Sequence, residues 1–195
     1  MPDRKDITHS ILIVSGSEQF DIAVKKALPA GSTSAVDVRR SEAVARRGVL
    51  DRYYDIVLIN TPLPDGMGID FAMDIAENGS ASVCLVTPQE IYDQVLDHVT
   101  DYGILVLSKS FPAERLSHAL RFLIASRNRM SALEAEVEAV KERMEEQRLI
   151  NKVKFLLIEK KHMTEDEAHR FIGRQAMNSG VSRKRAAEQL LEDLE

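Results

Sequence analysis

The chain has one cysteine and no tryptophan, and it contains no long run of apolar residues. A single thiol, Cys84, excludes an intramolecular disulfide framework and a cysteine-rich zinc site. No stretch reaches the roughly 18 consecutive apolar residues that a membrane-spanning helix needs, and residues 1–10 lack the apolar core of a signal segment. We therefore expect a cytoplasmic protein of a reducing compartment that does not interact with a membrane.

The chain also shows no nucleophile beside a base and no group of side chains at metal-ligand spacing. Both are needed by the common classes of hydrolytic and metal-dependent enzymes, so the sequence predicts no enzyme, no metal and no cofactor. The net charge of −5 for the 195 residues argues against a uniformly basic nucleic-acid coat.

Prolines and charges are distributed unevenly. All six prolines precede residue 113, and segment 113–161 contains neither proline nor glycine, which permits one very long helix. The net charge is −5 over 1–126, −2 over 127–147 and +2 over 148–195. A basic module on an acidic body is typical of a sensor that carries an effector for polyanions, and a solvated helical surface is the alternative.

Four short apolar runs occupy residues 11–14, 56–59, 83–86 and 104–107. Runs of this length, rich in branched side chains, predict strands that are buried on both faces of a parallel sheet, and a weaker strand fits at 35–38. Helical patterns follow the strands, so the order βα repeats five times. The expected fold class is an α/β, flavodoxin-like domain with a five-stranded parallel sheet.

Polar residues follow these strands, at the sheet edge where ligands bind in such folds. They are Ser15 with Gly16, then Asn60, Thr87 and Lys109. In this order and spacing, residues 9–125 resemble a response-regulator receiver domain. Asn60 stands where the family has its phosphoacceptor aspartate, Thr87 where it has a switch hydroxyl, and Lys109 where it has its invariant lysine.

The departures from the receiver pattern all concern its acidic residues. Ser15 and Gly16 replace the two acids that hold Mg²⁺, and neither supplies the carboxylate oxygens that this cation prefers. Asn60 is a neutral amide, which does not form the acyl phosphate of a carboxylate. The resemblance therefore implies a pseudo-receiver with a degenerate phosphoacceptor site, controlled by a regulatory protein or a small ligand. Glu18 or Asp65 could bind a cation, or serve only as a helix N-terminal acid and a turn residue.

Segment 126–147 carries a heptad pattern, which is typical of a coiled coil. Its apolar positions alternate at spacings of three and four residues, and Gln147 and Asn151 continue the series as polar members. The seam residues are Met130, Leu133, Val137, Val140 and Met144.

The charges beside this seam favour a parallel homodimer. Arg129 would face Glu134, and Glu136 would face Lys141, which are two attractive pairs, whereas a third pair of two arginines repels. The alternative is that the stripe packs on the chain's own domain.

The last segment, 148–195, predicts an all-α domain of three helices. Thr164 and Glu167 form a capping-box pattern for the second helix, Gly180 ends it, and Ser182 can cap the third. A small shared core is expected from Val153, Phe155, Leu156, Leu157, Ala168, Ile172, Ala176 and Ala187.

Segment 148–194 resembles the ANTAR family, the AmiR and NasR type of transcription antitermination regulators. Residues 150–158 resemble the opening Ile-x-x-Ala-Lys-x-x-Leu-Met of that domain, with Val153 and Ile158 as departures. Residues 163–168 resemble the start of its second helix, 174–177 resemble its Arg-x-Ala-Met, and Ala187 falls at an alanine of the third helix.

This resemblance implies a dimer that binds RNA hairpins in leader transcripts and lets polymerase read through. Hairpin loops present phosphates and splayed bases, which basic and aromatic side chains contact. Phe155 or Phe171 could stack on a base, although their spacing favours the core. The candidate RNA-binding residues are Lys154, Lys161, Arg170, Arg174, Arg183 and Lys184.

The expected organisation is a pseudo-receiver over 1–125, a coiled-coil linker helix over 126–147 and an RNA-binding domain over 148–195. Two other functions stay open. A DNA-binding response regulator could use the basic run 182–185 at the start of the third helix. A scaffold that binds no nucleic acid would show none of the steep salt dependence of nucleic-acid binding.

Overall fold

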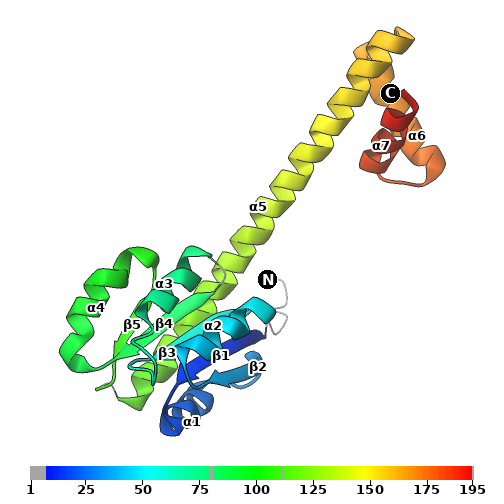
Figure 1. Ribbon diagram of the computed structural model, residues 1–195. Coiled ribbons are helices and arrows are strands. Elements are labelled where there is room, and N and C mark those ends of the chain that lie inside the picture. Colours follow the sequence, from blue (N-terminus) through cyan, green and yellow to red (C-terminus); the bar gives the residue numbers. More distant parts are fainter. Residues whose placement is uncertain (1–7, 80, 111, 195) are drawn as a thin grey trace. The chain divides into compact units, whose positions relative to one another are not determined.

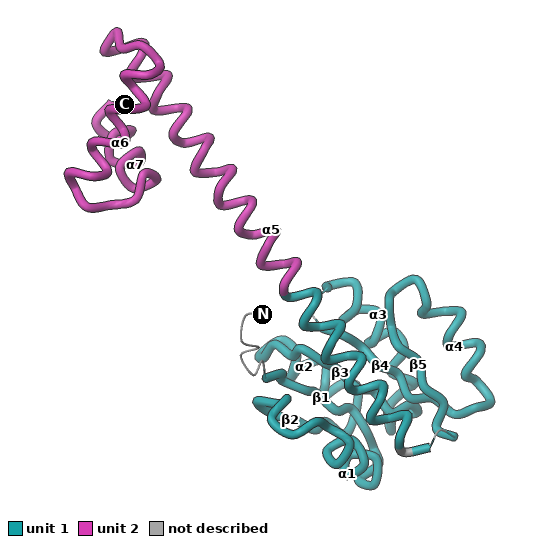
Figure 2. The backbone as a smooth tube through the Cα atoms, turned by 180° about the vertical axis from the view of Figure 1, so that it is seen from behind, with its two compact units in different colours: residues 1–131 teal, residues 132–195 magenta. Residues whose placement is uncertain are grey.

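A computed structural model of the chain describes residues 8–79, 81–110 and 112–194. Residues 1–7, which include most of the segment expected to lack a signal core, lie outside the described residues. The chain forms two compact units, Met1–Ser131 and Ala132–Glu195, which are coloured separately in Figure 2.

In chain order the elements are β1 His9–Ser15, α1 Glu18–Ala27, β2 Thr33–Arg39, α2 Glu42–Asp51, β3 Ile56–Asn60, α3 Ile69–Glu77, β4 Ser82–Thr87, η1 Gln89–Ile91, α4 Tyr92–Val99, η2 Thr100–Tyr102, β5 Leu105–Ser108, α5 Ala113–Lys161, α6 Glu165–Ser179 and α7 Arg183–Leu194.

The first unit contains a five-stranded sheet in the order β2-β1-β3-β4-β5, with every neighbouring pair parallel. This confirms the predicted α/β fold, and the weak strand expected at 35–38 lies within β2. Parallel strands leave all their carboxyl ends at one edge, so residues far apart in the sequence meet there.

The two faces of the sheet are covered by different helices (Figure 1). On one face, Leu12 and Val14 of β1 belong to a buried cluster with Ala45 of α2, Phe71 of α3 and Val95 of α4. On the other face, alternate residues of the same strands pack against α1 and the first turns of α5; members of this cluster include Ile11, Ile13, Val24, Leu116 and Leu120. Because both faces are covered, the central strands are apolar between their polar ends, as the continuous runs predicted.

The long helix α5 has 49 residues and spans the segment without proline or glycine. Its first turns bury Leu116, Leu120 and Leu123 against the sheet. Near the end of this contact, Arg127 is buried, with its guanidinium Nε 3.5 Å from a carboxylate oxygen of Asp55. The sequence prediction of one uninterrupted helix is confirmed.

The second unit is built from the last part of α5 together with α6 and α7. Val153 and Leu157 of α5, Ile172 of α6 and Ala187 of α7 are buried in one small cluster. The expectation that Phe155 belongs to this core is wrong, because its side chain is 64% exposed. On a helix with 3.6 residues per turn, Phe155 lies about 160° from Val153 and Leu157, which face the core.

The predicted helix ends in this unit are confirmed. Thr164 and Glu167 form a reciprocal capping box at the start of α6. Gly180 ends α6 with a left-handed backbone, φ 65°, which glycine adopts without steric cost. The hydroxyl of Ser182 accepts a hydrogen bond from the amide of Arg185 at the start of α7.

Candidate functional site

The carboxyl edge of the sheet brings together the predicted receiver-site residues. Ser15 and Asn60 are register partners on adjacent strands, and Gly16 follows Ser15 directly. The backbone amide of Lys109 donates to the carbonyl of Thr87 at 2.7 Å, which places the ends of β4 and β5 side by side. The sequence therefore identified a set of residues that the sheet does collect at one edge.

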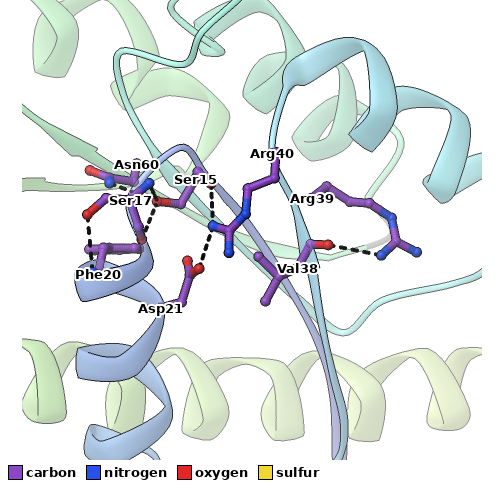
Figure 3. A network of polar contacts seen from close by, with 8 residues as sticks. All are labelled: Ser15, Ser17, Phe20, Asp21, Val38, Arg39, Arg40 and Asn60. Atoms are coloured by element: carbon purple, nitrogen blue, oxygen red, sulfur yellow. Dashed lines mark hydrogen bonds and ion pairs between the residues drawn. The ribbon is translucent and has the colours of Figure 1, made fainter.

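Asn60 and Ser15 satisfy each other at this edge (Figure 3). The side-chain amide of Asn60 donates to the Ser15 hydroxyl at 2.9 Å, and the backbone amide of Ser17 donates to the same oxygen at 3.0 Å. Both Ser15 and Asn60 are buried. A hydroxyl and an amide bonded in this way do not fit Mg²⁺, which prefers carboxylate oxygens in an octahedral arrangement.

Arg40, just beyond β2, is the residue at this edge that sequence reasoning missed. Its guanidinium donates to the carbonyl of Ser15 at 2.9 Å and to a carboxylate oxygen of Asp21 at 2.5 Å. Figure 3 shows the guanidinium pointing between these two groups, whereas the neighbouring Arg39 turns away onto the carbonyl of Val38. The sequence pattern that bears on this pair is the acid Asp21 beside the apolar positions of α1. This pattern does not indicate that Arg40 is the partner of Asp21.

Thr87 and Lys109 complete the edge. Thr87 is fully buried, and its hydroxyl has no hydrogen-bond partner among the residues that the structure describes. Partial burial lowers the pKa of the Lys109 ammonium from its ordinary value. The edge thus holds hydroxyls, an amide and a lysine in place of an acidic cluster.

Asp65 serves as a helix cap. Its two carboxylate oxygens accept the backbone amides of Glu42 and Ala43 at 2.8 and 2.9 Å, which satisfies free donors at the start of α2. These hydrogen bonds lower the pKa of Asp65. Glu18 lies in the first turn of α1, where an acid complements the helix dipole. Within the described part of the chain, no group of three or more His, Cys, Asp or Glu is placed to hold a metal ion.

The predicted seam residues on α5 are all exposed. Their exposed fractions range from 46% to 54%, so the stripe is not covered as a core face would be. These residues are Met130, Leu133, Val137, Val140 and Met144.

Among the candidate RNA-binding residues, Lys154 is held by a partner of its own domain. Its ammonium lies 2.8 Å from a carboxylate oxygen of Glu165, and its side chain is only 15% exposed. The pair joins α5 to the first turn of α6 and lowers the pKa of Glu165. Lys161 lies over the ring of Phe171, 5.9 Å from its centroid, and Phe171 itself is partly buried against the core.

The other candidates lie on α6 and α7. Arg170 and Arg174 are exposed and one helical turn apart, and the side chain of Arg170 also donates to the carbonyl of Asp166. Arg183 is exposed and Lys184 half-buried in the first turn of α7. Exposed arginines on adjacent turns, together with cations at a helix start, form a surface that can contact phosphates.

Comparison with known proteins places both units. The ANTAR domain family matches residues 138–191. The transcriptional regulatory protein PdtaR of Mycobacterium tuberculosis, in strains CDC 1551 and H37Rv, is 34% identical over 141 residues, which is 72% of this chain and 68% of PdtaR.

Solved receiver structures share the fold of the first unit. The signal receiver domain of an HD domain-containing protein from Pseudomonas fluorescens Pf-5 is 22% identical with a TM-score of 0.54, covering 63% of this chain and 90% of that domain. The chemotaxis response regulator CheY4 of Vibrio cholerae is 16% identical with a TM-score of 0.51, covering 60% and 98%. Over the described residues, no helix combines the length and apolarity needed to cross a membrane.

Proposed function

Because this chain belongs to the family of ANTAR-domain response regulators that includes PdtaR, we propose that it is an RNA-binding transcription antiterminator. The observation that carries the proposal is the ANTAR match over 138–191, which contains the exposed arginines of α6. In this role the chain binds hairpins in leader transcripts and catalyses no reaction. A protein that acts on nascent bacterial transcripts works in the cytoplasm, which is the compartment we expect.

The RNA-binding surface is assigned to exposed basic side chains rather than to every lysine and arginine of the domain. Arg170 and Arg174 on α6 and Arg183 on α7 have the exposure and charge that phosphate contacts require, and the half-buried Lys184 adds a further charge in the same turn of α7. Lys161 extends this set from α5. Lys154 is the weakest candidate because its ammonium already pairs with Glu165 at 2.8 Å.

The active form is proposed to be a homodimer through the seam on α5. Half-exposed apolar side chains from Met130 to Met144 at heptad spacing need a partner helix to bury them. The charge pairs beside the seam favour a parallel arrangement, in which the same ends of both chains meet.

The receiver-like domain is proposed to act without phosphorylation. Asn60 offers no carboxylate to phosphorylate, and its side chain is engaged with Ser15. Control by a regulatory protein or a small ligand on this domain takes the place of a phosphoryl group.

Binding of the purified full chain to a panel of RNA hairpins and to matching DNA duplexes tests the function. We expect a preference for a hairpin, a loss of about tenfold or more for Arg174→Ala, and an affinity that falls steeply with salt. Lys26→Ala, which removes an exposed lysine of α1 in the first unit, is the matched control and should bind normally. A preference for duplex DNA would favour the DNA-binding alternative, and no nucleic-acid binding would favour the scaffold.

A comparison of Lys154→Ala with Glu165→Ala separates a structural from an RNA-binding role of Lys154. Both variants break the same ion pair, so both should lower the thermal stability of the C-terminal domain to a similar extent. If Lys154 also contacts RNA, then Lys154→Ala alone loses hairpin affinity. The two substitutions change the charge of the domain in opposite directions, so a small difference in affinity is expected in any case, and we expect Lys154→Ala to lose less than about tenfold relative to the unaltered chain.

A further inference from the structure

The exposed apolar stripe of α5 extends beyond the predicted seam. Beyond the C-terminal end of the seam, two more large apolar side chains of this helix, Phe155 and Ile158, are 64% and 39% exposed. Both belong to the part of α5 whose opposite side forms the core of the C-terminal domain. An exposed phenylalanine next to a well-formed core indicates a contact that the isolated chain does not make.

Helix geometry puts these residues on the same face as the seam. Phe155 lies eleven residues after Met144, which is three helical turns plus about 20°. Ile158 lies fourteen residues after Met144, which is two heptads. Val153 follows Met144 by nine residues and so faces about 180° away, where it is fully buried in the core. The seam face of α5 is therefore opposite to the face that α6 and α7 cover.

Asn151, which lies between Met144 and Phe155, also suits a second copy of the helix. With Met130 at an a position, every seventh residue up to Ile158 is again an a position, and Asn151 is one of them. A single asparagine at an a position favours two parallel strands in one register, because its polar group is satisfied only opposite its counterpart. Within one chain, the side-chain amide of Gln147 donates to the Asn151 oxygen at 3.3 Å, an exposed contact that does not involve the Asn151 amide nitrogen.

We propose that the interface between two copies of this chain does not end at Met144 but continues through Asn151 and Phe155 to Ile158. The first helix of one C-terminal domain then packs directly against the same helix of the other. This rests on the proposed homodimer and extends it into the RNA-binding domain. The occupant of the stripe is a second α5 rather than RNA, since the stripe is in line with the heptads and the exposed arginines lie on α6.

Cysteine cross-linking of the full chain tests this continuation. Across a parallel pair, a positions face each other closely enough for a disulfide to form. The native thiol of Cys84 does not interfere, because burial raises its pKa to about 12 and keeps it protonated and inaccessible. We expect Met144→Cys, Asn151→Cys and Ile158→Cys each to form a disulfide-linked dimer on mild oxidation. Glu138→Cys, an exposed position off the seam, should remain monomeric on a non-reducing gel.

The outcomes separate the two proposals. Cross-linking at Met144 without cross-linking at Asn151 or Ile158 would leave the dimer in place and overturn its continuation. Failure at all three positions would remove the proposed dimer itself, whatever the RNA result.

A second variant addresses Phe155 directly. Phe155→Ala should raise the dimer dissociation constant about tenfold or more, and circular dichroism should show an intact fold because the side chain is outside the core. Within the disulfide-linked Met144→Cys dimer, the same change should leave hairpin affinity unchanged within about twofold. A loss of RNA affinity that persists in the linked dimer would mean that Phe155 stacks on RNA, and the proposal would be wrong.

Discussion

At the scale of single residues, Arg40 and Asp21 define the electrostatics of the degenerate receiver edge. The Asp21 side chain is only 5% exposed, and the Arg40 guanidinium, 2.5 Å away, is the cation that neutralises it. The same guanidinium also holds the carbonyl at the end of β1. A buried carboxylate without a cation is costly, so this arginine is needed for stability even though half of its own side chain is exposed.

Arg40→Ala should therefore lower the free energy of unfolding of the receiver-like domain by about 2 kcal/mol, because it leaves the Asp21 carboxylate buried and unpaired. Urea denaturation followed by circular dichroism measures the loss. The double variant Asp21→Asn/Arg40→Ala should recover part of it, since no charge then remains buried. Arg47→Ala, on the exposed face of α2, is the matched control and should change stability by less than about 0.5 kcal/mol. Equal effects of the two arginine substitutions would contradict this account.

At the scale of elements, helix α6 is fastened at its start by two acidic side chains. Glu167 accepts the backbone amide and the hydroxyl of Thr164 in the capping box, and these hydrogen bonds lower its pKa. The pKa of Glu165 is lowered by its bond to Lys154. A carboxyl group whose pKa is lower in the folded state stabilises the fold above its unfolded pKa, and this stabilisation is lost as the pH falls through the folded pKa.

The C-terminal domain should consequently melt at lower temperature as the pH falls from 7 to below about 4, the range in which an ordinary glutamate is protonated. Glu167→Gln keeps a hydrogen-bonding side chain but removes the titrating group, so its melting temperature should depend less on pH. Thr164→Ala removes only the hydroxyl bond to the Glu167 carboxylate and leaves the backbone amide bond, which lowers the pKa most, so this variant should flatten the profile less than Glu167→Gln. Thermal melts across this pH range test the prediction, and unchanged slopes in both variants would refute it.

How much of each element was predictable depends on whether its determinants are local. The strands, the length of α5 and the caps at Thr164 and Gly180 follow from short patterns, because apolar runs, helix breakers and capping residues act within a few positions. The pairing of Arg40 with Asp21 joins the segment after β2 to α1, and the pairing of Asp65 with the start of α2 joins residues 23 apart. Local sequence patterns do not identify partners at such separations.

Phe155 shows a different limit of sequence reasoning. Apolar spacing marks a face that is to be buried, but it does not say whether the same chain or another one covers it. Val153 and Phe155 are two residues apart and lie on opposite sides of α5, one in the core and one exposed. The sequence counted both as core because two apolar faces on one helix overlap in a linear pattern.

At the scale of the whole molecule, the receiver-like domain is connected to the C-terminal domain, for which we propose RNA binding. The two share one helix, α5, which begins on the receiver-like sheet and ends in the C-terminal core. A change in how α5 leaves the first domain, or in whether two copies of α5 pair, would reach the C-terminal domain without any chemistry at Asn60. This is the control expected of a protein whose acidic site is replaced by hydrogen-bonded neutral groups.

The hairpin affinity of the full chain should then be the same, within about twofold, with and without acetyl phosphate and Mg²⁺, and no phosphoryl group should be incorporated. Asn60→Asp alone should not restore labelling, because Ser15 and Gly16 still supply no carboxylate for the cation. The variant Ser15→Asp/Gly16→Asp/Asn60→Asp supplies all three acids, and a Cβ at position 16 would meet Pro64 at an ordinary 3.4 Å. We expect phosphate-affinity gels to show labelling of this variant only. Labelling of this triple variant would show that the reagent works. Labelling of the unaltered chain at a receiver residue would contradict the prediction, because the domain would then accept a phosphoryl group without an aspartate at position 60.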